Sequence, residues 1–100
     1  MPSTDFLTHN YIAVETAALI QRRRGMAQAR ALLEHVLPVT QMHWVKEVTH
    51  RAAVTALLLS GAPRISLVDW VSFEVMRERG ITTAFAFDQD FRDQGFTTVP

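Results

Sequence analysis

The chain contains no cysteine among its 100 residues, which excludes disulfide scaffolds, cysteine-ligated zinc sites and thiol nucleophiles. An excess of charge of one sign is also missing, because ten lysines and arginines balance ten aspartates and glutamates. No overall basic field therefore favours binding to nucleic acid or membrane, although a neutral chain can still carry a local site. The content of 48% hydrophobic and 20% charged residues is typical of a globular protein and excludes a disordered chain.

Long hydrophobic runs are absent as well. Apolar runs such as Ala56–Leu59 reach only four residues, whereas a helix that crosses a membrane needs about 20. The first residues have neither a cationic start nor a continuous apolar segment, so they do not form a secretory signal. We therefore expect a cytoplasmic protein without membrane association. Because independent domains usually have about 100–200 residues, we expect a single domain over residues 1–100.

Helical and strand patterns alternate along the chain, with glycine and proline between them. We expect helices at about 10–24 (capped by Thr8 or Asn10), 26–37, 46–60 and 66–79, and short strands at 6–7, 39–45, 83–87 and 97–99. Gly25, Pro38 and Gly80 are the expected stops. Residues 83–87 form a largely apolar run typical of a strand buried on both faces. The alternation predicts an α/β fold around a parallel sheet.

Glu15 stands in an unusual place for a carboxylate. Its neighbours at helical spacing are apolar, and so is most of the remaining helix, which predicts a helix buried nearly all round. An unpaired buried carboxylate costs several kcal/mol, so Glu15 would need a metal, a cation or a polar cleft. A salt bridge to an arginine, or a helix edge that touches solvent, is the alternative interpretation.

Asp69 follows Ser66 at the spacing of a capping box, in which each residue bonds to the other's backbone amide. This structural role is one interpretation. The apolar residues around Asp69, among them Trp70 and Phe73, predict a largely buried helix end, where a carboxylate can instead serve a functional site.

Asp88 directly follows the apolar run at 83–87. That position predicts a side chain at the carboxyl end of a parallel strand, which is the edge where open α/β sheets bind ligands. An ordinary turn aspartate is the alternative. Asp90, two residues on, either assists Asp88 or faces solvent.

Other chemistries find little support. The four histidines share no helical face with zinc-ligand spacing, and the sequence has no nucleophile elbow, dinucleotide-binding glycine motif or P-loop.

Three segments carry a resemblance to a known family: ISLVDWVSFEVM at 65–76; GI at 80–81 with AFDQDF at 86–91; and LTHNY at 7–11 with VET at 14–16. Together they resemble PIN-domain proteins, specifically the VapC-like ribonuclease toxins of bacterial toxin–antitoxin pairs. The resemblance covers nearly the whole chain, and it is most specific at the C-terminal motif.

The resemblance implies a three-layer α/β fold with a parallel sheet flanked by helices. It also implies that Glu15, Asp69 and Asp88 bind Mg²⁺ or Mn²⁺ and hydrolyse RNA phosphodiester bonds, which suits the preference of hard cations for carboxylate oxygens. Ser66 and Asp90 would support these acids without binding the metal themselves. A further set of side chains either contacts RNA phosphate or is solvated: Arg22, Arg23, Arg24 and Arg30.

The chain departs from the family pattern at its start. Family members begin with a strand that ends in an aspartate, the first metal ligand, and about two helices follow before the segment matching Phe6. We therefore expect an N-terminally truncated PIN-like fold with little nuclease activity and low stability, or with a homodimer that supplies a missing edge. Two function classes follow: a metal-dependent ribonuclease toxin restrained by an antitoxin protein, or a noncatalytic remnant that serves as a protein-interaction module.

Overall fold

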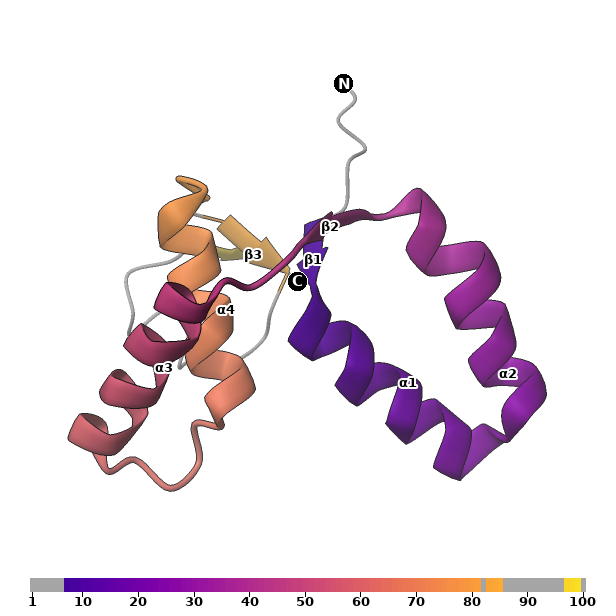
Figure 1. Ribbon diagram of the computed structural model, residues 1–100, viewed down its shortest axis with the longest axis horizontal. Helices are drawn as coiled ribbons and strands as arrows, with labels where there is room; N and C mark the ends of the chain where they lie inside the picture. Colours follow the sequence, from indigo (N-terminus) through magenta and orange to yellow (C-terminus); the bar gives the residue numbers. More distant parts are fainter. Residues whose placement is uncertain (1–6, 82, 86–96, 100) are drawn as a thin grey trace. The chain divides into compact units, whose positions relative to one another are not determined.

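The computed structural model describes residues 7–81, 83–85 and 97–99. It divides the chain into two compact units, Met1–Val45 and Lys46–Pro100. Each unit contains one pair of parallel strands together with helices (Figure 1). The predicted α/β class with parallel strand pairing is confirmed, whereas the single domain over 1–100 stays a prediction. Within the described residues, every helix is too short or too polar to span a membrane.

The first unit pairs two strands that are distant in sequence. Strand β1 (Leu7–His9) runs parallel to β2 (Gln41–His43), with Leu7 opposite Gln41 and His9 opposite His43. Between them the chain forms four helical segments: α1 (Asn10–Arg24), α2 (Met26–Ala31), η1 (Leu32–Val36) and η2 (Leu37–Val39). A helical connection of this kind is what parallel strands require.

Helices α1 and α2 form a hairpin around Gly25 (Figure 1). The N–H of Gly25 donates to the carbonyl oxygen of Gln21 at 3.1 Å, and the carbonyl oxygen of Gly25 accepts from the N–H of Ala29 at 3.2 Å. Gly25 adopts a φ of 90°, a conformation that glycine adopts without steric cost. The predicted end of the first helix at Gly25 is therefore confirmed.

The second helix differs from its prediction. Regular α-helix ends at Ala31, and the chain continues through the π-helical η1 into the 3₁₀ turn η2. The prediction that Pro38 ends the helix was wrong, because Pro38 lies in the first turn of η2, where its missing N–H needs no partner. The strand expected at 39–45 is correspondingly shorter.

The second unit packs two helices together and pairs two strands. Helix α3 (Glu47–Ser60) contacts α4 (Leu67–Glu78), and β3 (Thr83–Phe85) runs parallel to β4 (Thr97–Val99). These bounds agree with the sequence prediction for both helices and for β4. The remainder of the strand expected at 83–87 lies outside the described residues.

The core of the second unit is centred on α4, where four consecutive residues, 70–73, are buried, so most sides of this helix are covered. Val71 and Phe73 are fully buried, and Ala53 of α3 is fully buried as well. The rings of Trp70 and Phe73 meet edge to face with centroids 5.3 Å apart, a favoured aromatic geometry. The apolar residues of α4 therefore anchor the helix that carries Asp69.

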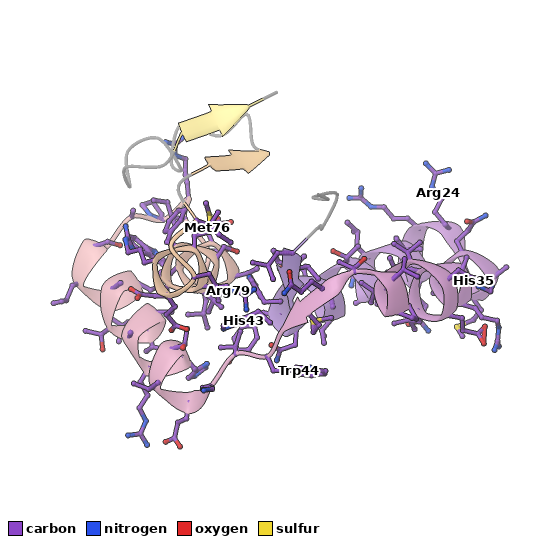
Figure 2. The ribbon with its side chains drawn as sticks, turned by 90° about the horizontal axis from the view of Figure 1, so that it is seen from above. Arg24, His35, His43, Trp44, Met76 and Arg79 are labelled. Atoms are coloured by element: carbon purple, nitrogen blue, oxygen red, sulfur yellow. The ribbon has the colours of Figure 1, made fainter. Side chains whose placement is uncertain are left out.

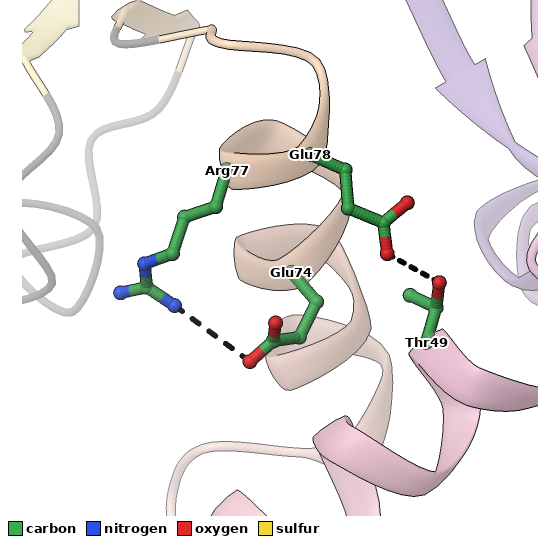
Figure 3. A network of polar contacts seen from close by, with 4 residues as sticks. All are labelled: Thr49, Glu74, Arg77 and Glu78. Atoms are coloured by element: carbon green, nitrogen blue, oxygen red, sulfur yellow. Dashed lines mark hydrogen bonds and ion pairs between the residues drawn. The ribbon is translucent and has the colours of Figure 1, made fainter.

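A polar contact joins α3 to α4 beside this core. The hydroxyl of the buried Thr49 donates to a carboxylate oxygen of Glu78, and on α4 the guanidinium of Arg77 lies 4.0 Å from the carboxylate of Glu74 (Figure 3). A buried hydroxyl needs such a partner, because leaving it unbonded costs about 1–3 kcal/mol. The contact fixes the two helices relative to each other along their axes.

Candidate functional site

Glu15 lies in the second turn of α1, and its side chain is exposed. Of the fifteen residues of α1, all of them described, only Ala13 is buried, and Val14 is 69% exposed. The prediction of a helix buried nearly all round was therefore wrong. Within the described residues of its own unit, α1 packs mainly against α2 and β1. The Glu15 side chain is exposed there, and its candidacy rests on the family resemblance rather than on burial.

Asp69 is held by the capping box that its spacing predicts. The backbone N–H of Ser66 donates to Oδ2 of Asp69 at 3.1 Å, and the backbone N–H of Asp69 donates to Oγ of Ser66 at 3.2 Å. Among the described residues, no group donates a hydrogen bond to Oδ1 of Asp69. One carboxylate oxygen is thus fixed by the helix and the other stays open.

The surroundings of Asp69 place it at the border between core and water. Asp69 itself is half-buried, whereas Trp70, the next residue, is buried and Phe73 is fully buried. The predicted burial of this helix end holds only from Trp70 onward, because Ser66 is exposed and residues 67–69 are half-buried. The positive end of the helix dipole also favours a negative charge in this first turn.

Replacing Ser66 tests how much the capping box contributes to the stability of the protein. We expect Ser66→Ala to lower the free energy of unfolding by about 1 kcal/mol, since the alanine offers no acceptor for the Asp69 N–H. Ser66→Thr retains a hydroxyl and should lose much less. Urea unfolding of both variants beside the parent protein measures the difference. Equal stability of Ser66→Ala and the parent would show that the cap contributes nothing.

The remaining predicted acids divide as follows. Asp88 and Asp90 lie outside the described residues, while Glu15 belongs to the first unit and Asp69 to the second. Within the described part of the chain, no group of three or more histidine, aspartate or glutamate side chains is placed to hold a metal ion. Ser66 and Asp69 are thus the two predicted site residues that the structure brings together. The meeting of Glu15, Asp69 and Asp88 stays a prediction.

Two histidines form a polar feature that helical spacing does not reveal. His9 and His43 end β1 and β2, and the parallel register places them opposite each other. His9 is 3% exposed, and its Nδ1 accepts a hydrogen bond from the N–H of Ile12 at 3.3 Å, so His9 caps α1. Burial, with a contribution from the charge of His43, lowers the pKa of His9 from 6.5 to about 4.

Asn10 has a different role from the cap predicted for it. Its side-chain oxygen accepts a hydrogen bond from the N–H of Val45 at 2.7 Å, which ties the start of α1 to the segment after β2. The predicted caps Thr8 and Asn10 were therefore wrong. The parallel register of β1 and β2, rather than any short-range pattern, would have been the signal for these polar contacts.

Comparison with known proteins finds similarity to a known protein, in sequence and in structure. No family model matches the chain. The 23S rRNA-specific endonuclease VapC20 from two strains of Mycobacterium tuberculosis is 35% identical to the chain over 94 residues, which are 93% of this chain and 72% of the relative. The crystal structure of M. tuberculosis VapC20, described as a toxin that cleaves the sarcin–ricin loop, superposes with a TM-score of 0.80. That match has 34% identity and covers 95% of this chain and 74% of VapC20.

Proposed function

Because the chain belongs to the VapC-like family of PIN-domain ribonuclease toxins, we propose that it is the toxin of a toxin–antitoxin pair and a metal-dependent endoribonuclease. The observation that carries the proposal is the similarity to VapC20 along almost the whole chain, in sequence (35% identity) and in fold (TM-score 0.80). VapC20 is a 23S rRNA-specific endonuclease. Ribosomal RNA is accordingly the first substrate class to test.

Three carboxylates would hold the metal in this proposal: Glu15, Asp69 and Asp88. The open Oδ1 of Asp69 and the exposed side chain of Glu15 both suit a Mg²⁺ or Mn²⁺ ion, which prefers carboxylate oxygens. When bound, such a cation supplies a water with a lowered pKa and neutralises charge on the phosphate. The protein's own contribution is the placement of negative charge where the cation is needed.

Ser66 has a positioning role in this proposal. Its backbone N–H donates to Oδ2 of Asp69 and so holds the carboxylate in the first turn of α4, while its Oγ accepts from the backbone N–H of Asp69 and fixes the turn itself. A carboxylate that is already ordered loses less conformational freedom when it takes up a ligand. Asp90 is proposed to support Asp88 in a similar way.

The partners in this proposal are RNA and the cognate antitoxin protein, together with a second copy of the chain. Both units expose large apolar side chains: Val39 in the first is 85% exposed and Leu59 in the second is 82% exposed. Exposed apolar residues of this kind, where they form a patch, are typical of surfaces that another protein covers. They support protein partners without deciding which partner covers which surface.

The test is RNA cleavage by the purified protein. Ribosomal RNA and an unrelated messenger RNA are incubated with the 100-residue chain and with the longest in-frame product of its gene, each with Mg²⁺, with Mn²⁺ or with a chelator. We expect site-specific cleavage that needs the metal. Cleavage that persists in chelator, or no cleavage by either product, would contradict the proposed activity.

A further inference from the structure

The tip of the α1–α2 hairpin concentrates positive charge. Residues 21–31 contain four arginines and no acidic residue, in a chain whose formal net charge is zero. We call these arginines the arginine tip: Arg22, Arg23, Arg24 and Arg30. All four are exposed, and Figure 2 shows the side chain of Arg24 pointing away from the ribbon.

These cations form few ion pairs among the described residues. Among the described residues, no acidic side chain forms an ion pair with Arg22, Arg23 or Arg24. The guanidinium of Arg30 lies 3.9 Å from the carboxylate of Glu34, and these side chains are 66% and 54% exposed. A surface pair of this kind is weak, so the positive charge of the tip stays available.

Stabilisation of the helix end explains only part of the arrangement. Cations in a last turn complement the helix dipole, and the last turn of α1 holds Arg22, Arg23 and Arg24. Arg30 does not close a helical stretch, because helical backbone continues through η1. Successive helix residues also point about 100° apart, so the arginines of α1 fan out in three directions rather than converging on the helix end.

The chemistry of the tip fits a backbone that carries many phosphates. Guanidinium groups bind phosphate oxygens through two parallel N–H donors, which ammonium groups cannot do. A fan of such groups across two helices matches successive phosphates along a polynucleotide better than it matches a single carboxylate. Each neutralised phosphate also releases counterions, which makes the contact strongly dependent on salt.

We propose that the arginine tip is a phosphate-binding surface that grips the backbone of the RNA substrate, an inference that rests on the proposed function. The three arginines of α1 lie seven to nine residues along the helix from Glu15, so they contact RNA away from that carboxylate. It contributes affinity without reading bases, since phosphate contacts carry no sequence information. An acidic segment of a partner protein is the competing occupant, and the experiment below separates the two.

The experiment measures RNA binding in chelator, where metal-dependent cleavage cannot proceed. Fluorescence anisotropy of a labelled RNA follows binding of the chain and of Arg22→Gln/Arg23→Gln/Arg24→Gln between about 50 and 200 mM salt. We expect the variant to bind at least about tenfold more weakly at low salt. The slope of log K against log salt should also flatten by about 0.7 for each lost contact to single-stranded RNA.

A matched triple variant controls for net charge. Arg51→Gln/Arg64→Gln/Arg79→Gln removes the same charge from exposed arginines of the second unit and should keep the parent slope. The corresponding arginine-to-lysine triple at 22–24 keeps the charge and should keep the parent salt slope, with some affinity lost because lysine lacks the paired N–H donors; this variant controls for damage to α1. Equal losses in both glutamine triples, or an unchanged slope in the tip variant, would overturn the proposal. Parent-like RNA binding with loss of antitoxin binding would assign the tip to the acidic protein partner instead.

A cleavage assay with metal separates this surface from the activity itself. In a protein that cleaves RNA, the tip variant should raise KM and leave kcat unchanged, because the carboxylates are intact. Cleavage with a parent-like KM would overturn the phosphate-binding surface and leave the nuclease proposal standing. RNA binding that depends on the tip, in a protein that never cleaves RNA, would support the phosphate-binding surface and overturn the nuclease proposal.

Discussion

Asp69→Asn is expected to lower metal-dependent RNA cleavage by about 100-fold or more while the protein stays folded. Asparagine has nearly the same volume and keeps an oxygen that can accept the Ser66 N–H, so the cap of α4 survives. What it loses is the negative charge that would bind the cation. A loss of about 3 kcal/mol of transition-state stabilisation corresponds to about 100-fold in rate.

The measurement compares initial rates of RNA cleavage at one fixed metal concentration that just saturates the parent protein, in the form of the protein that cleaves. Glu74→Gln is the matched control, because it neutralises another acid on α4, one that pairs with Arg77. It should cleave at about the parent rate. Circular dichroism confirms that each variant is folded. Parent-like cleavage by folded Asp69→Asn would leave Asp69 with its capping role alone.

Helix α4 shows which features short-range sequence patterns can predict. Its start depends on a reciprocal bond between Ser66 and Asp69, three residues apart, whereas its burial also needs α3, which packs against it. All the groups that decide this turn are local, so the spacing alone was sufficient. The turn at Gly25 was predictable for the same reason.

Glu15 shows where the pattern is insufficient. Apolar residues around a carboxylate indicate that the helix could be covered by other parts of the protein. They do not show which element, if any, packs against that helix. In the first unit α1 contacts α2 and β1 and leaves Val14 and Glu15 exposed. Burial is a property of the packed structure, so burial does not support a functional role for Glu15, which now rests on the family resemblance.

His9 and His43 show a second limit, because 34 residues separate them in the sequence and no helix or turn relates them. The parallel register of β1 and β2 brings them together, and the same register lets Asn10 accept from the N–H of Val45. Strand pairing over such distances depends on global topology. The cap of α1 therefore came from a histidine rather than from Thr8 or Asn10, the residue types that usually cap helices.

This cap makes stability depend on pH in a predictable direction. With its pKa lowered to about 4, His9 stays neutral in the folded protein between pH 6.5 and 4, whereas in the unfolded chain it takes up a proton below its ordinary pKa of 6.5. Unfolding therefore binds a proton in this range, and the free energy of unfolding falls as the pH falls. Protonation at Nδ1 would also remove the acceptor for the Ile12 N–H. The expected loss is about 3 kcal/mol across the range.

Urea unfolding at about pH 7 and about pH 4.5 measures this loss, and His9→Asn isolates its source. Asparagine can cap a helix but does not titrate, so the variant should lose about 2–3 kcal/mol less than the parent between the two pH values. Comparing the change with pH, rather than the stability at one pH, removes the cost of placing a smaller side chain in a buried position. His35→Asn replaces an exposed histidine of η1 and should keep the parent's pH dependence. The same pH dependence in His9→Asn and the parent would show that acid acts on other groups and that the buried imidazole of His9 does not control the stability of the first unit.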